Sequence, residues 1–126
     1  MAQGKIEVEE SGGNIFADLE LPDADELLLK AQLVSELRRL IEELSLTQTA
    51  AARLTGVAQP DLSNLLRGQL RGFSVERIMR MLTALGQDLE ILVRPHPGQG
   101  EAGRITVGVT RQPVAHSLEA HARLKA

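Results

Sequence analysis

The stretch TQTAAARLTGVAQPDLSNLLRG, residues 47–68, decides the fold of this chain. Counted from its first glutamine, a small residue, Ala52, stands at the fifth position and Gly56 at the ninth, and leucines follow at the fifteenth and eighteenth. This spacing predicts two short helices that cross at a steep angle. Ala52 lets the helices approach closely, and Gly56 takes the left-handed backbone that ends the first helix. Leu62 and Leu65 then face the first helix, so the opposite face of the second helix is free.

Two further helices flank this pair. Residues 23–44 carry apolar side chains at helical spacing, and Asp23 with Glu26 forms a capping-box pattern at their start. Ser74 is a good N-cap for the sequence VERIMRMLTAL, which Gly86 ends. The expected helices cover residues 23–44, 48–55, about 60–67 and 75–85.

After the last helix, the spacing of the apolar side chains changes from a helical period to an alternation. Residues 88–94, DLEILVR, alternate apolar and charged side chains and predict a strand that Pro95 ends. A single strand beside helices leaves its backbone groups unpaired, so we expect it to pair with a second copy of the chain. Pairing within the chain, with RITVGVT (104–110) or KIEVE (5–9), is the alternative.

The expected organisation has three parts. They are an N-terminal arm (1–22), a helical domain with a terminal strand (23–94), and a linker with a candidate strand and a flexible tail (95–126).

Composition limits the classes of function. The chain has 126 residues, no cysteine and only two aromatic residues, Phe16 and Phe73. With so few aromatic residues the core must be aliphatic, and binding of single-stranded nucleic acid by base stacking is not expected. The lack of cysteine excludes disulfides and thiolate metal sites. The N-terminus does not have the pattern of a secretory signal, and no apolar run approaches the ~20 residues of a membrane span. These features predict a cytoplasmic protein with no membrane contact.

Charge is unevenly distributed along the chain. The net charge of −3 divides into −7 for residues 1–45, +3 for residues 46–80 and +1 for residues 81–126. The positive segment holds the two crossing helices, and phosphate binding depends on the local field more than on the total charge. A merely solvated face of arginines is the alternative interpretation.

At residues 46–68 the sequence resembles the Xre/Cro/lambda-repressor-like helix-turn-helix family. The resemblance is carried by Leu46, Thr47, Gln48, Ala52, Leu54, Gly56, Val57, Gln59, Pro60, Asp61, Leu62, Ser63, Leu65, Leu66, Arg67 and Gly68. It implies a mainly α fold: a lambda-repressor-like four- to five-helix bundle with a C-terminal β-strand or short hairpin. Thr55 and Ala58 depart from the family pattern, and Ala58 has no hydroxyl to cap the second helix of the motif.

This resemblance implies that the second helix of the motif reads base edges in the DNA major groove. The expected base contacts are Gln59, Asp61, Ser63 and Asn64. A glutamine amide bonds adenine N6 and N7 together, so Gln59 is the preferred candidate. Asp61 either accepts a hydrogen bond from cytosine or stabilises the first helical turn, and Ser63 either contacts DNA or packs near the core.

The remaining candidates are polar or basic side chains at the ends of the two helices. The expected phosphate contacts are Thr47, Gln48, Arg67 and Arg71. Amide groups in the first turn of the helix at 48–55 add further donors for phosphate.

The leading hypothesis is a sequence-specific regulator of transcription, acting as an autorepressor dimer on a palindromic operator. Residues 71–74 and the strand region 86–95 resemble the HigA-type antitoxins, which implies the alternative of neutralising a RelE/HigB-like toxin through surfaces outside the helix-turn-helix. An enzyme is not expected, and neither is a metal or cofactor. The histidines His96, His116 and His121 stand in the tail without a metal-binding pattern.

Overall fold

The computed structural model describes residues 6–8 and 23–110, where the elements follow the order β1, α2, α3, α4, α5, β2. The helices are α2 (Ala24–Glu43), α3 (Gln48–Thr55), α4 (Gln59–Leu66) and α5 (Val75–Ala84), and the strands are β1 (Ile6–Val8) and β2 (Gly108–Thr110). The mainly α fold is confirmed, and each helix lies within about one residue of its expected bounds. The expectations for the rest of the arm (1–5 and 9–22) and for the tail from residue 111 lie outside the described residues.

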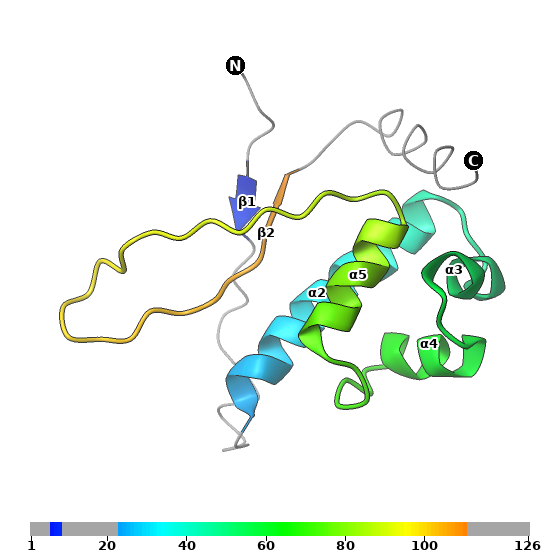
Figure 1. The fold of residues 1–126 in the computed structure, drawn as a ribbon, viewed down its shortest axis with the longest axis horizontal. Coiled ribbons are helices and arrows are strands. Elements are labelled where there is room, and N and C mark those ends of the chain that lie inside the picture. Colours follow the sequence, from blue (N-terminus) through cyan, green and yellow to red (C-terminus); the bar gives the residue numbers. More distant parts are fainter. Residues whose placement is uncertain (1–5, 9–22, 111–126) are drawn as a thin grey trace.

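The helices form one aliphatic core. Helices α2 and α5 lie side by side, and α3 and α4 pack on one side of that pair (Figure 1). The largest fully buried side chains are Leu37, Leu40, Leu62, Leu65, Ile78, Met81 and Leu85. No helix in the described part of the chain is both long enough and apolar enough to cross a membrane.

The turn between α3 and α4 has the predicted geometry. Gly56 ends α3 with φ 75° and ψ 21°, in the left-handed region. Ala52 is buried where the two helices meet, Val57 fills the core beneath the turn, and Leu62 and Leu65 of α4 are fully buried. Truncating either leucine to alanine removes about 2–5 kcal/mol of stability in typical cores, so α4 is firmly oriented about its own axis.

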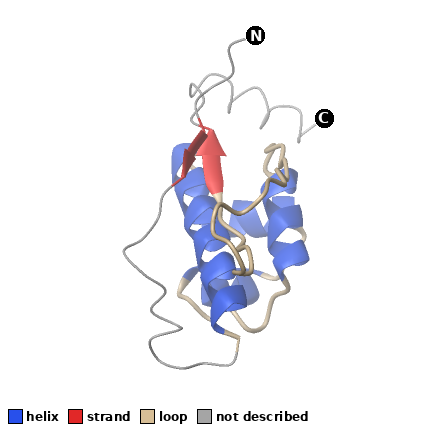
Figure 2. Ribbon diagram, turned by 90° about the vertical axis from the view of Figure 1, so that its left-hand side faces the viewer, coloured by secondary structure: helices blue, strands red, loops and turns tan. Residues whose placement is uncertain are grey.

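Residues 88–94 do not form a strand within the single chain, and their expected pairing with a second copy stays a prediction. These residues follow α5 as extended, exposed backbone without a ladder partner. The strands form instead in the two segments considered as alternatives: β1 and β2 pair antiparallel, with Glu7 opposite Val109 (Figure 2). Alternating side chains report only a local preference, whereas a strand also needs a neighbour with matching backbone groups.

The predicted capping box at the start of α2 is also not formed. Asp23 occupies the N-cap position, but its side chain makes no capping hydrogen bond. Its carboxylate instead accepts two hydrogen bonds from Arg71, Nε to Oδ2 at 3.1 Å and Nη2 to Oδ1 at 3.0 Å. Glu26 pairs with Lys30 on the next turn, at 3.0 Å. The carboxylate of Asp23 is therefore bound by a bidentate guanidinium from the loop after α4 and not by the amides of the first turn of α2.

Replacing Gly56 by alanine tests the turn. An added Cβ there meets nothing within 4 Å, so the cost comes from the left-handed backbone alone. We expect a loss of about 1–2 kcal/mol in the free energy of unfolding, measured with urea. Gly72→Ala is the matched control, because its Cβ is equally unobstructed and its φ is not positive. Equal stability of the two variants would contradict the assignment of the turn.

The ion pair between Asp23 and Arg71 predicts a specific pH dependence. The hydrogen bonds from Arg71 lower the pKa of Asp23 below its ordinary value. A carboxyl whose pKa is lower in the folded state stabilises the fold above its unfolded pKa, about 4, and loses that contribution as the pH falls through its folded pKa. Wild type should therefore exceed Asp23→Asn in stability at neutral pH, and the difference should vanish in acid. Arg71→Gln should reproduce this profile; a difference that stays constant down to pH 2 contradicts it.

Candidate nucleic-acid interface

Helix α4 presents a polar edge to solvent along its length. Its side chains alternate between the core and the surface as the burial of Leu62 and Leu65 requires. The exposed residues are Gln59, Pro60, Asp61 and the C-cap Arg67, and Ser63 and Asn64 are half-buried beside them. All four expected base-contact residues thus have access to solvent.

Two glutamines connect the beginnings of the two helices of the motif. The side-chain amide of Gln59 on α4 donates a hydrogen bond to Oε1 of Gln48 on α3, at 3.0 Å. Both residues are exposed. This contact places one amide expected to bind a base next to one expected to bind phosphate, and each restricts the rotamers of the other.

The N-terminus of α3 offers hydrogen-bond donors to an anion. The hydroxyl of Thr47 caps the helix by accepting from the amide of Ala50 at 3.0 Å. The amides of Gln48 and Thr49 belong to the first turn, where no helical carbonyl is available to them. Together with the partial positive charge of the helix end, these donors suit a phosphate oxygen.

Arg67 lies at the other end of the polar edge. Its guanidinium donates to Ser63 Oγ at 3.2 Å and also to Asn64 Oδ1. Three of the expected DNA contacts therefore form one cluster over the last turn of α4. Ala58, at the N-cap of this helix, makes no side-chain capping bond, as its lack of a hydroxyl predicts.

Arg71 is exposed in the loop after α4, and its guanidinium is paired with the carboxylate of Asp23. Hydrogen bonds from its guanidinium to Asp23 raise its pKa above the ordinary value. The structure thus brings Thr47, Gln48, Gln59, Ser63, Asn64 and Arg67 to the two helices of the motif, and it holds Arg71 on the N-terminus of α2.

Sequence patterns missed one positioning residue, Arg38 of α2, whose guanidinium hydrogen-bonds the carbonyl oxygen of Leu66 at the end of α4. A cation at this end complements the helix dipole and an open carbonyl. No local signal identifies it, because the two residues are 28 positions apart. The guanidinium of Arg77 lies over the ring of Phe73, at 4.4 Å from its centre.

No cluster of histidine, aspartate and glutamate able to hold a metal ion occurs in the residues that the structure describes. His96 is placed beside Glu101, 3.4 Å between Nε2 and Oε1, in the loop that leads to β2. His116 and His121 are outside the described part.

Comparison with known proteins supports the motif. A family model described as "Helix-turn-helix domain" matches residues 15–94. A solved structure described as "Putative XRE Family Transcriptional Regulator" shares 45% sequence identity, with a TM-score of 0.63 over 68% of this chain and 97% of that one. The search of curated proteins found no match. The match over most of the chain, together with the turn at Gly56 and the polar edge of α4, shows that this chain belongs to the helix-turn-helix domain family.

Proposed function

We propose that this chain is a sequence-specific regulator of transcription that inserts α4 into the major groove of double-stranded DNA. The observation that carries this proposal is the pairing of Gln59 with Gln48 at the exposed start of the motif. One amide then reaches a base edge while the neighbouring amide and the first turn of α3 reach the adjacent phosphate. The structural relative described as an Xre-family regulator supports the same assignment.

The base contacts follow from the order of side chains along α4. Gln59 bonds the N6 and N7 atoms of adenine, and Asp61 accepts from N4 of cytosine. Ser63 and Asn64 approach the next base pairs, with the guanidinium of Arg67 anchored on both of them. The phosphate contacts are Thr47, Gln48, Arg67 and Arg71.

A single α4 helix reads only a few base pairs, so two copies on a palindrome are required for useful specificity. We infer that the regulator is a homodimer whose half-sites are about one helical turn of DNA apart. Repression of its own promoter is the simplest use of such a dimer, because bound protein excludes polymerase from overlapping DNA.

A second candidate is an antitoxin that also covers a basic toxin. The favouring observation is the net charge of −7 over residues 1–45, with Asp25, Glu26 and Glu42 exposed on α2, outside the motif. Such a surface attracts a positively charged partner. If a neighbouring gene encodes a small basic protein that arrests growth, co-expression of this chain should restore growth. Failure of that rescue removes the antitoxin candidate and leaves the regulator intact.

Selection of bound duplexes from a random pool tests the base contacts. Wild type should enrich one palindromic sequence. Gln59→Ala should relax one position in each half-site and weaken binding by about 1–3 kcal/mol. Arg39→Gln is the control outside the motif: it removes a guanidinium that Glu36 and Glu43 hold on α2, so it should leave the preferred sequence unchanged. Sequence-independent binding by all three proteins would contradict the proposed function.

The salt dependence of binding tests Arg71. If Arg71 exchanges Asp23 for a phosphate, Arg71→Ala should lower the slope of log affinity against log salt by about 0.9 per half-site. Asp23→Asn should raise affinity, because it releases the guanidinium. Asp25→Asn makes the same change of charge two residues away and should have the smaller effect. Equal effects of the two asparagine variants would indicate that only total charge matters.

A further inference from the structure

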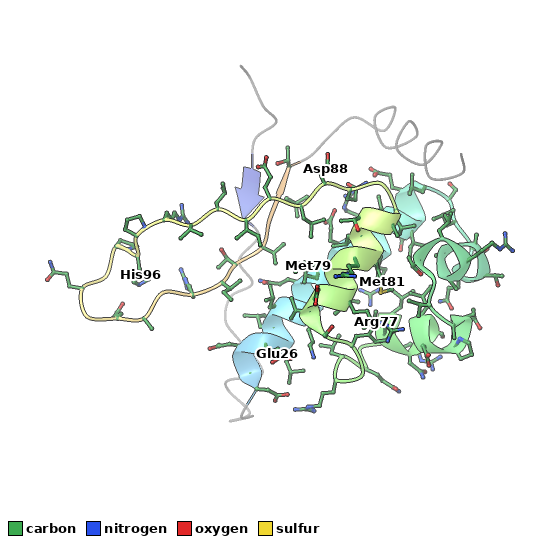
Figure 3. The ribbon with its side chains drawn as sticks, in the orientation of Figure 1. Glu26, Arg77, Met79, Met81, Asp88 and His96 are labelled. Atoms are coloured by element: carbon green, nitrogen blue, oxygen red, sulfur yellow. The ribbon has the colours of Figure 1, made fainter. Side chains whose placement is uncertain are left out.

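Arg77 lies in the first turn of α5, soon after the loop that leaves α4. Its side chain is exposed, and the carbon of its guanidinium is 4.4 Å from the centre of the Phe73 ring. Phe73 belongs to that loop and exposes only 6% of its surface, so its ring is a fixed platform. Figure 3 shows Arg77 at the end of α5 that receives the chain from α4. The ring therefore holds a positive charge over the loop beyond α4.

The guanidinium of Arg77 has no oxygen acceptor within the described part of the chain, unlike those of its neighbours. Arg67, Arg71 and Arg80 each donate hydrogen bonds to side-chain oxygens. The described contact of Arg77 is instead with the ring of Phe73. A ring face attracts a cation without supplying an oxygen or nitrogen acceptor, so the N–H donors of this guanidinium remain available to an anion.

The helix end beneath Arg77 adds to its charge. The N-terminus of a helix carries a partial positive charge, which favours acidic side chains and disfavours basic ones. The first turns of α2 and α4 follow this rule, with Asp25 and Glu26 in one and Asp61 in the other. In α5 a cation, Arg77, stands next to the acidic Glu76. Placing a cation here is unfavourable for the helix alone and favourable for a bound anion.

The position of this charge relative to α4 indicates which anion it meets. Under the proposed function α4 lies in the major groove, which is about 12 Å wide and has a phosphate backbone on each side. Helix α4 has 8 residues, about 12 Å of helix, so phosphates come near both of its ends. Gln48, bonded to Gln59 at the start of α4, is placed for phosphate at one end. Arg77, over the loop that follows α4, is placed for phosphate at the other.

We propose that Arg77 is a further DNA contact, whose guanidinium binds a backbone phosphate beyond the end of α4 while the ring of Phe73 holds it in place. This inference rests on the proposed function and adds a contact to the same site. Arg71 must release Asp23 before it can bind phosphate, whereas Arg77 has no carboxylate to release. A phosphate contact carries no base information, so Arg77 strengthens binding to every duplex and leaves the preferred sequence unchanged.

The salt dependence of binding tests this contact, measured on a selected palindrome and on an unrelated duplex of equal length. Arg77→Gln should lower the slope of log affinity against log salt by about 0.9 per bound copy on both duplexes. The same variant should weaken binding by about 3- to 10-fold per copy at about 0.1 M salt. Arg77→Lys keeps the charge and should keep the wild-type slope. Because Arg77 is exposed, neither variant opens the core.

Arg80→Gln is the matched control on the same helix. It removes one guanidinium, which is exposed and bound to Glu76 at 2.8 Å. The variant also releases the carboxylate of Glu76, so an effect of total charge alone would be at least as large as that of Arg77→Gln. We expect the smaller effect from Arg80→Gln. Equal slopes for the two glutamine variants would overturn the contact.

The outcomes distinguish this contact from the proposed function. If wild type prefers the selected palindrome but Arg77→Gln keeps its slope, the contact is overturned and the regulator stands. A loss of affinity confined to the selected palindrome would also overturn it, because that pattern belongs to a base contact. If wild type shows no sequence preference and Arg77→Gln still lowers the slope, the contact is supported and the proposed function is overturned. A wild type that binds neither duplex overturns both.

Discussion

The structure depends on one backbone constraint, the left-handed turn at Gly56 held beneath a close helix crossing. Gly56 ends α3 in the left-handed conformation, only Val57 and Ala58 separate it from α4, and Ala52 leaves room for α4 to cross α3. With that crossing fixed, burial of Leu62 and Leu65 sets the rotation of α4, and Arg38 holds its far end by the Leu66 carbonyl. The outward direction of Gln59 and its neighbours is a consequence of these packing contacts rather than of any contact they make themselves.

In the protein without DNA, the polar side chains of the motif already form hydrogen bonds within the chain, and this affects how they could bind DNA. Gln59 bonds Gln48, Arg67 bonds Ser63 and Asn64, and Arg71 bonds Asp23. Each neutral hydrogen bond is worth about 0.5–1.5 kcal/mol net, so exchanging one for an equivalent bond to DNA is nearly neutral in free energy. A wrong base that cannot replace the bond leaves a desolvated amide unpaired. Under the proposed function, the selectivity for DNA sequence would come from the cost of mismatches more than from the gain of matches.

The helices and the helix-turn-helix motif could be predicted from the sequence because their signals are local. Periodic leucines, the hydroxyl caps Thr47 and Ser74, and a glycine after the last helical residue act within a few positions of each other. Contacts across many positions carry no such signal. The carboxylate of Asp23 satisfies a local capping pattern but binds Arg71, 48 positions away, and Arg38 meets Leu66 across the core. The strand expected at 88–94 does not form within the single chain for the same reason: its side-chain pattern is present, and a partner strand is not encoded beside it in the chain.

A single structure can decide whether the side chains of α4 from Gln59 to Arg67 touch base edges, as we propose. The direct measurement is the structure of the chain bound to a duplex selected from a random pool. We predict α4 in the major groove, with the Gln59 amide on a base and Gln48 on the phosphate beside it. A complex in which α4 faces solvent, and the DNA lies against α2 or the loop of residues 87–107, would contradict it.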